Sequence, residues 1–211
     1  MKPVLNTGTT TLALKYKKGV VLGADTRVTA GYLIAHKKGR KIHQIRPYLA
    51  VTIAGVVADA QVLIEQVRNH INLYENLYGR QLSVKAAANY LSLLMYSHRL
   101  LPFITEMIIA GKDASGFKIF KLDPLGSIIE DNYLVSGSGS MFALGVLERG
   151  YKEDMEESEA ISLATSALLA AMKRDIASGD DFMIAIIDDE GYRELSKEEK
   201  NALIRNMEIG T

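Results

Sequence analysis

Hydrophobic and polar residues alternate along much of the first 55 positions, with the two-residue period that is typical of half-buried β-strands. The pattern predicts two hairpins, with strands over residues 10–16 and 20–25 and then over residues 41–45 and 49–55. Pro47 lies between the second pair of strands, where its missing N–H suits a turn. The chain is therefore expected to begin as β-sheet.

The period then lengthens to three and four residues. Apolar side chains recur at that spacing from Val57 to Tyr78, which predicts an amphipathic helix closed by Gly79. Ser83 is a favourable N-cap for a second helix, which we expect to end shortly before Pro102. Two helices thus follow one another without an intervening strand.

Strand patterns return in the second half of the chain, and a second pair of helices interrupts them. The predicted strands cover residues 106–113, 117–123, 126–137 and 182–188. The predicted helices cover residues 141–151 and 158–177. A capping box over residues 196–199 predicts the start of a last helix. Strands and helices therefore come in blocks and do not alternate. This order predicts an α+β fold, a four-layer αββα sandwich of two antiparallel β-sheets flanked by helix pairs.

Length and composition fit one domain with a substantial core, since the chain has 211 residues and 48% of them are hydrophobic. Lys plus Arg and Asp plus Glu both number 25, so the formal net charge is zero. That balance argues against nucleic-acid or membrane partners attracted by bulk charge. No apolar run reaches the roughly 18 residues of a membrane span, and the first eight residues lack a secretory pattern. We therefore expect a cytoplasmic protein.

Metal and thiol chemistry find no support in the sequence. The absence of cysteine excludes disulfides, thiol nucleophiles and zinc–thiolate sites. The four histidines, His36, His43, His70 and His98, show no ligand spacing such as HExxH. The sequence therefore predicts no metal site and no cofactor.

Thr9 is the first of three consecutive threonines and directly follows Gly8. Threonine is a good strand former, so the run has a simple structural explanation. Cleavage of the Gly8–Thr9 bond would give Thr9 both a hydroxyl nucleophile and an α-amine, whose reference pKa near 7.7–8.0 suits a base. Amide cleavage by such a residue also needs a nearby cation and backbone N–H donors for the oxyanion.

Three residues at strand ends are candidates for these supporting roles. Asp25 ends the second predicted strand, Lys41 begins the third, and Gly55 ends the fourth directly before a helix, where free N–H groups can meet an anion. Read singly, they have simpler explanations as a turn residue, a solvated strand residue and a strand terminator. Residues 137–140 form a Gly-Ser loop that suits a connector or a phosphate cradle, although it lacks the lysine of a P-loop.

Six segments together carry a resemblance to a known family. They are GTTTLAL, GVVLGADTRVTAG, GRKIHQI, TIAGVVADA, VSGSGSMFALGVLE and RDIASGDD. In this order and spacing they resemble the β subunits of the proteasome, which are N-terminal-nucleophile hydrolases. The resemblance extends from Gly8 to about Tyr192. The chain length and the segment SGSGS are more similar to the archaeal type than to the shorter bacterial relatives.

The resemblance implies roles for the candidate residues around the nucleophile. Thr9 would attack after autocatalytic loss of residues 1–8 as a propeptide, and the remaining chain would form a single catalytic domain. Lys41 would lower the pKa of the nucleophile, and Asp25 would orient Lys41. The Gly55 N–H would stabilise the oxyanion.

Three more residues would form hydrogen bonds around the Thr9 amine according to the same resemblance: Ser138, Asp175 and Ser178. Read alone, Asp175 and Ser178 suit the end of a helix closed by Gly179. The resemblance also implies which residues line the pocket for the residue before the cut, namely Val28, Ile53 and Val57, with Ala35 and Gly39 nearby. All five are small or apolar, so we expect cleavage after hydrophobic residues with modest discrimination.

The function implied by the resemblance is that of a threonine endopeptidase. The subunit would act inside a barrel of stacked heptameric rings, with β rings between rings of α subunits. The substrates would be unfolded polypeptides supplied by an ATPase regulatory particle. Two alternatives stay open: a poorly processed structural β subunit kept for ring assembly beside an active paralogue, and a non-proteolytic hydrolase of a small amide.

Overall fold

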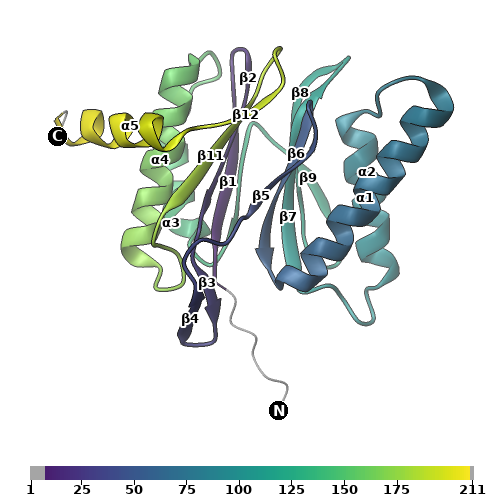
Figure 1. The fold of residues 1–211 in the computed structure, drawn as a ribbon, viewed down its shortest axis with the longest axis horizontal. Helices are drawn as coiled ribbons and strands as arrows, with labels where there is room; N and C mark the ends of the chain where they lie inside the picture. The colour runs from purple at the N-terminus through teal and green to yellow at the C-terminus, as the bar shows by residue number, and fades with distance from the viewer. Residues whose placement is uncertain (1–7, 210–211) are drawn as a thin grey trace.

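The computed structural model describes residues 8–209, with side chains up to residue 205. Of the predicted propeptide, residues 1–7 lie outside the described residues and only Gly8 lies within them. Figure 1 shows two β-sheets packed face to face, with helices covering the outer face of each. The predicted four-layer αββα sandwich is therefore confirmed.

Two five-stranded antiparallel sheets form the inner layers. The first has the order β10-β1-β2-β11-β12, with β1 over Thr10–Tyr16, β2 over Gly19–Asp25, β10 over Tyr133–Gly137, β11 over Phe182–Ile187 and β12 over Tyr192–Glu194. The second has the order β5-β6-β7-β8-β9, with β5 over Ile42–Arg46, β6 over Leu49–Gly55, β7 over Thr105–Asp113, β8 over Gly116–Leu122 and β9 over Ile128–Glu130. A separate hairpin pairs β3 (Val28–Ala30) with β4 (Leu33–His36).

Helices form the outer layers. The first pair, α1 (Val57–Tyr78) and α2 (Val84–Ser97), covers the second sheet, and the other pair, α3 (Ser140–Gly150) and α4 (Glu157–Arg174), covers the first. A last helix, α5 (Lys197–Ile209), extends from the side of the sandwich (Figure 1). Within residues 8–209 no helix combines the length and the apolar character that crossing a bilayer requires.

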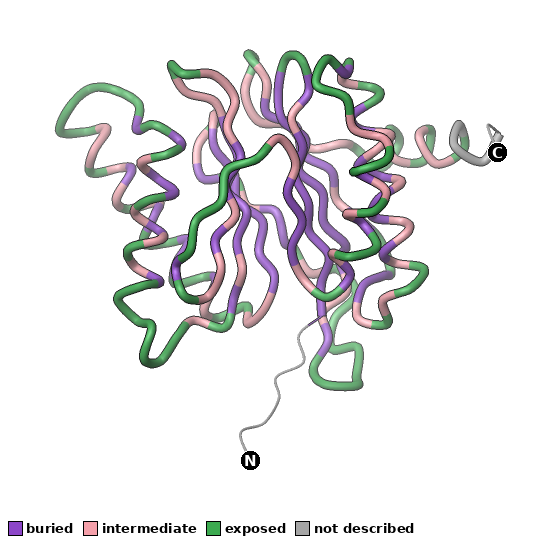
Figure 2. Tube along the Cα trace, turned by 180° about the vertical axis from the view of Figure 1, so that it is seen from behind, coloured by how far each residue is buried: buried purple, intermediate pink, exposed green. Residues whose placement is uncertain are grey.

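Three hydrophobic cores separate the four layers. The core between the sheets contains small residues such as Ala13, Ala50 and Ala110, which let the sheets approach closely. Larger residues such as Leu63, Leu91 and Leu168 fill the two cores between sheet and helices. Figure 2 shows buried positions along the inner strands and exposed positions along the outer sides of the helices. The hydrophobic periodicity of the sequence therefore agrees with the faces of the strands and helices that are buried between the layers.

The predicted helix caps explain where helices begin and end. The Ser83 side chain accepts a hydrogen bond from the Ala86 N–H at 3.1 Å, as expected for the N-cap of α2. Gly79 closes α1 with a left-handed φ of 62°. Helix α4 ends at Arg174, earlier than predicted, because Asp175 takes an extended conformation and leaves the helix.

One predicted strand was wrong. Residues 126–137 do not form a single strand, because β9 pairs with β8 in one sheet and β10 pairs with β1 in the other. The segment therefore crosses from one sheet to the other, and periodicity cannot reveal a change of partner. The short strands β3, β4 and β12 were not predicted, since three or four partly exposed residues carry too little alternation.

Candidate active site

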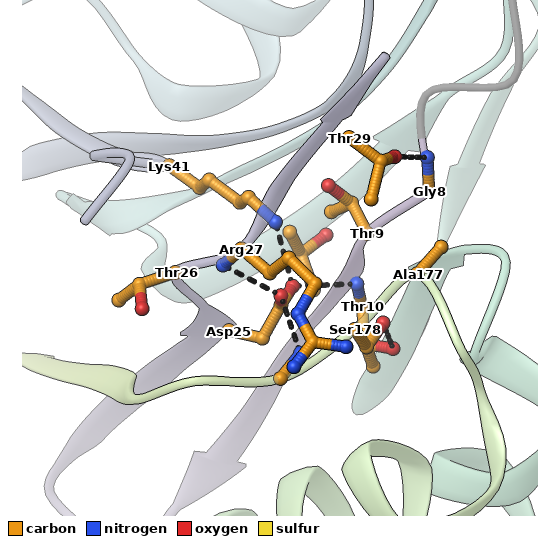
Figure 3. A network of polar contacts seen from close by, with 12 residues as sticks. Gly8, Thr9, Thr10, Asp25, Thr26, Arg27, Thr29, Lys41, Ala177 and Ser178 are labelled. Atoms are coloured by element: carbon orange, nitrogen blue, oxygen red, sulfur yellow. Dashed lines mark hydrogen bonds and ion pairs between the residues drawn. The ribbon is translucent and has the colours of Figure 1, made fainter. Parts of the chain in front are cut away.

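Thr9 lies directly ahead of β1, at one end of the space between the sheets, and is only 5% exposed. The neighbouring strand β2 ends at Asp25, and the register that pairs Thr11 with Ala24 brings Asp25 beside Thr10. Lys41 comes from the facing sheet, immediately before β5. Residues distant in sequence thus meet around Thr9 (Figure 3).

Asp25 is completely buried and is the centre of a polar network. Its Oδ1 accepts hydrogen bonds from Lys41 Nζ at 2.7 Å and from the Thr10 N–H at 2.9 Å. Its Oδ2 accepts from the backbone N–H groups of Arg27 and Gly179, both at 3.0 Å. Figure 3 shows Lys41, Arg27 and Thr10 converging on the carboxylate. Four donors fix the orientation of Asp25, and Asp25 in turn holds the Lys41 ammonium in place.

Lys41 is 5% exposed, and it lines the same cavity as Thr9. Burial lowers the pKa of Lys41 because it penalises the charged form, while the Asp25 carboxylate opposes the shift by its charge and its hydrogen bond. A buried lysine beside a single carboxylate can stabilise negative charge on a neighbouring oxygen. It can also exchange a proton more readily than a solvated lysine.

A second polar network surrounds the backbone nitrogen of Thr9. The Thr9 N–H donates to Ser138 Oγ at 3.1 Å, and the Ser138 hydroxyl donates to Asp175 Oδ2 at 2.6 Å. Ser178 Oγ donates to the same carboxylate oxygen at 2.6 Å and lies 2.7 Å from the Thr10 hydroxyl. The structure therefore brings Ser138, Asp175 and Ser178 together next to the atom that cleavage would convert into an amine.

Gly8 occupies a position that admits no side chain. A Cβ atom there would lie 1.7 Å from the Ala177 Cβ and 3.0 Å from the Ser138 Oγ. The Gly8 N–H also donates to the Thr29 hydroxyl at 3.0 Å. The residue before Thr9 is therefore held against the wall of the site, with its carbonyl adjacent to the Thr9 backbone.

Gly55 lies at the end of β6 and has a φ of 125°, which side-chain-bearing residues rarely adopt. A Cβ on Gly55 would lie 2.3 Å from the backbone oxygen of Ile104. The close contact with Ile104 and the backbone conformation both explain why glycine occupies this position. Gly55 lines the cavity together with Thr9, which places its backbone at the candidate reaction centre.

A cavity of about 360 Å³ opens beside Thr9 and Lys41. Four of the five predicted specificity residues line it: Val28, Gly39, Ile53 and Val57. Ala35 is not among the residues that line it, and its part in specificity stays a prediction. Ala35 lies on β4, a strand whose four residues are all exposed. The cavity also includes residues that the sequence reasoning missed: Thr29, His36, Arg40, His43 and Gln61.

Comparison with known proteins decides the family. A family model described as a proteasome subunit matches residues 5–187. The chain belongs to the proteasome family. It is 40% identical over 196 residues to proteasome subunit beta 2 of Hyperthermus butylicus, covering 93% of this chain and 92% of that protein. It is also 44% identical over 184 residues to proteasome subunit beta 2 of Ignicoccus hospitalis, covering 87% and 86%.

A third relative, proteasome subunit beta of Methanospirillum hungatei, is 42% identical over 200 residues and is matched across 96% of its length. The proteasome-family sandwich is therefore the N-terminal-nucleophile hydrolase fold expected from the sequence. Membership makes the chain a protease of the proteasome family, and it implies assembly with other proteasome subunits.

Thr10 is a polar site residue that the sequence reasoning passed over. Its N–H binds Asp25 and its hydroxyl meets Ser178, so it links the two polar networks of the site. The run of three threonines signals more than strand propensity here, because Thr11 also forms a buried hydrogen bond with Thr52 at 3.0 Å. Within the described part of the chain, no cluster of His, Asp and Glu is suited to a metal ion.

Proposed function

We propose that this chain is the catalytic β subunit of an archaeal-type proteasome core and that Thr9 is its nucleophile. One observation carries the proposal: Thr9 lies at a cavity beside the buried Lys41–Asp25 pair, and its nitrogen binds the Ser138–Asp175 network. Each of these side chains comes from a different part of the chain. Their meeting at one threonine provides a nucleophile, a nearby cation and a network that holds the nitrogen, which together suit acyl transfer.

Activation begins with the peptide bond between Gly8 and Thr9. Thr9 Oγ1 attacks the Gly8 carbonyl carbon, the carbon–nitrogen bond breaks, and the nitrogen takes a proton to become the free α-amine. Residues 1–8 are then held as an ester on Thr9, and a water molecule hydrolyses it. The absence of a side chain on Gly8 supports this step, since any Cβ would be pressed against Ala177.

Peptide cleavage repeats the same chemistry on a substrate carbonyl. The Thr9 hydroxyl adds to the carbon while the free α-amine, directly or through a water molecule, accepts the hydroxyl proton. That proton then passes to the leaving amine, and water releases the acyl-enzyme. The Gly55 N–H would donate to the oxyanion, an interaction whose loss typically lowers kcat by roughly 10²–10³-fold.

The two polar networks would have different roles: one acts on the Thr9 hydroxyl and the other on the Thr9 nitrogen. Lys41 lines the same cavity as Thr9, and its positive charge would favour the alkoxide-like state of the Thr9 hydroxyl during attack. Asp25 holds Lys41 and keeps the site electrically balanced. Ser138 and Asp175 hold the Thr9 nitrogen, so the amine that forms on cleavage is already oriented as a base.

The assembled particle would consist of heptameric rings, with α rings outside β rings, and would degrade unfolded polypeptides supplied by an ATPase. The surface of the subunit supports extensive association. Leu100 and Leu101 are 89% and 83% exposed, and Met141 on α3 is 82% exposed. Exposed apolar side chains such as these are available for contacts with neighbouring subunits.

The experiment that tests the proposal is mass spectrometry of the chain after co-expression with an α subunit, combined with hydrolysis of a fluorogenic peptide. We expect a mass that corresponds to a chain beginning at Thr9, and hydrolysis by the assembled particle only. An assembled but inactive particle that keeps residues 1–8 would identify a structural β subunit instead. A small active oligomer that hydrolyses only a single small amide would contradict the protease assignment.

A further inference from the structure

Thr10 has a buried hydroxyl that the proposed chemistry does not use. The residue is completely buried, and its Oγ1 lies 2.7 Å from the Oγ of Ser178, which is equally buried (Figure 3). Thr10 begins β1 directly after the candidate nucleophile, and Ser178 lies on the loop between α4 and β11. The two hydroxyls are therefore shielded from bulk solvent, although they lie next to Thr9.

The direction of the hydrogen bond between Thr10 and Ser178 follows from the number of protons available. A serine hydroxyl has one proton to donate, and a carboxylate only accepts. Ser178 donates its proton to Asp175 Oδ2 at 2.6 Å. The proton between Thr10 and Ser178 therefore belongs to Thr10. Both hydrogen bonds are thus donated in the direction of Asp175.

The same carboxylate oxygen is also connected to the Thr9 nitrogen. Ser138 donates to Asp175 Oδ2 at 2.6 Å, and the Ser138 oxygen accepts from the Thr9 N–H at 3.1 Å. Two hydroxyl branches therefore meet at Asp175 Oδ2: one begins at Thr10, and the other ends at the Thr9 nitrogen. An unbroken chain of hydrogen bonds thus connects the Thr10 hydroxyl with the atom that cleavage converts into an amine.

Hydrogen bonds in such a chain strengthen one another, because each donor polarises the hydroxyl that it binds. Donation from Thr10 makes the Ser178 hydroxyl a stronger donor to Asp175. The negative charge of the carboxylate is then partly spread over its donors, so it stabilises a neighbouring ammonium group less. The Thr10 hydroxyl therefore favours the neutral form of an amine at Thr9.

We propose that Thr10 is a positioning residue whose buried hydroxyl, acting through Ser178 and Asp175, keeps the Thr9 α-amine in its neutral, proton-accepting form. The inference rests on the proposed function, since the amine exists only after cleavage before Thr9. The hydrogen bond from the Thr10 N–H to Asp25 is a backbone contact, and a change of the Thr10 side chain leaves its donor in place. Side-chain variants therefore test the hydroxyl separately from the Asp25 network.

The test measures the pH dependence of kcat/KM for one fluorogenic peptide with assembled, processed particles. Thr10→Val keeps the branched shape of threonine and removes the hydroxyl. The loss of one hydrogen bond should move the acid limb of the profile upwards by about half to one pH unit. Activity on the acid side should therefore fall about three- to tenfold and recover at higher pH. Thr10→Ser keeps the hydroxyl and should keep the wild-type profile.

Thr11→Val is the matched control for the loss of a buried hydroxyl. Thr11 follows Thr10 on the same strand, is equally buried, and accepts a hydrogen bond from Thr52 at 3.0 Å. Its hydroxyl takes no part in the chain that leads to Asp175. Thr11→Val should therefore lower the thermal unfolding temperature about as much as Thr10→Val does, but it should not move the acid limb. An equal pH shift in both variants would overturn the inference.

A second variant separates the hydroxyl from the effect of crowding. The Thr10 hydroxyl lies against Gly139, where a Cβ would be 2.0 Å from Oγ1. Thr10→Ala adds no bulk there and should show the same shift as Thr10→Val. A shift in Thr10→Val alone would be due to crowding and would overturn the inference. If Thr10→Val does not assemble, the comparison of Thr10→Ala with Thr10→Ser provides the same test, since these two differ by one oxygen.

The outcomes distinguish this inference from the proposed function. A processed Thr10→Val particle that loses activity equally at every pH, or that keeps the wild-type profile, overturns the role of the hydroxyl. Either result leaves the protease assignment intact, because the wild-type particle is still processed and active. A processed wild-type particle that hydrolyses no peptide at any pH contradicts the proposed function itself.

Discussion

Thr9 has two different surroundings, and their contrast explains how the site is built. On one side, Asp25 and Asp175 organise dense hydrogen-bond networks around the backbone of Thr9 and Thr10. On the other side, a cavity exposes mainly apolar surface, including Val28, Ile53 and Val57, although polar residues also line it. On the polar side, each buried charge has defined hydrogen-bond partners, so few substitutions are tolerated there. We propose that the cavity side binds the substrate side chain, and its apolar residues can be altered without disturbing those networks.

The difference has a physical origin. A buried charge is tolerated only when its partners are complete, so removal of one partner leaves an uncompensated charge in a poorly solvated place. A cavity wall contributes mainly apolar contact, whose loss is proportional to the area removed. Substitutions in the polar networks should therefore reduce activity or stability strongly, whereas substitutions in the cavity wall should change specificity slightly. The four substitutions below are ordered from the largest expected effect to the smallest.

Thr9→Ala should abolish both leader removal and peptide hydrolysis, because one hydroxyl performs both attacks. The expected loss of kcat/KM is roughly 10⁴-fold or more, as for other enzymes without their nucleophile. Mass spectrometry of the chain and a fluorogenic assay measure the two effects separately. Thr9→Ser is the matched control, since it keeps the hydroxyl and should keep both reactions. A Thr9→Ala particle that still removes residues 1–8 would disprove the assignment of Thr9 as the nucleophile.

Lys41→Ala should reduce activity strongly and also destabilise the fold. It leaves Asp25 buried without its ammonium partner, which typically costs about 3–5 kcal/mol of unfolding free energy. Thermal unfolding and kcat measure the two consequences. Lys112→Ala is the control: it removes a lysine–aspartate pair whose side chains are 39% and 73% exposed, so little change is expected. Equal destabilisation by both substitutions would contradict the claim that the buried Lys41–Asp25 pair stabilises the fold more than an exposed ion pair does.

Gly8→Ala should slow leader removal by about one to two orders of magnitude, because overpacking a tight position typically costs about 1–3 kcal/mol. The added Cβ would collide with the Ala177 Cβ. The time course of leader loss, followed by mass spectrometry, measures the rate. The double substitution Gly8→Ala with Ala177→Gly removes the collision partner and should restore much of that rate. Peptide hydrolysis by chains that have finished processing should be unaffected, since Gly8 is then gone.

Ile53→Val should have the smallest effect, a loss of about tenfold or less in kcat/KM for peptides with a large apolar residue before the cut. One methylene in such a pocket corresponds to about 1–3 kcal/mol, and the low end of that range, which suits a change from Ile to Val, is about tenfold or less. Ala35→Ser tests the prediction that Ala35 contributes to specificity, since Ala35 does not line the cavity. A panel of fluorogenic peptides should show a changed preference for Ile53→Val and none for Ala35→Ser. A specificity change at Ala35 would mean that another surface contributes to the pocket.

The sequence was most informative where a residue had a local signature. The periods of the strands and helices and the caps Ser83 and Gly79 were confirmed because such features depend on neighbours within a few positions. Resemblance then named the residues that the structure gathers around Thr9. It was less informative for the cavity, because it did not name His36, His43 and Gln61, which also line the cavity. Whether a residue lines the cavity depends on the direction of its side chain in the folded structure, which a local sequence pattern does not give.

The hydrophobic period of each segment is enough to predict the layers, because it fixes which face of each strand and helix is buried. The candidate nucleophile also follows from the sequence, because Gly8 directly precedes the threonine run. Which charges meet depends instead on the packed fold. The approach of Lys41 to Asp25 and the crossing of β9–β10 between sheets depend on strand partners distant along the chain. Partner choice is a property of the packed sheets, and no local pattern encodes it.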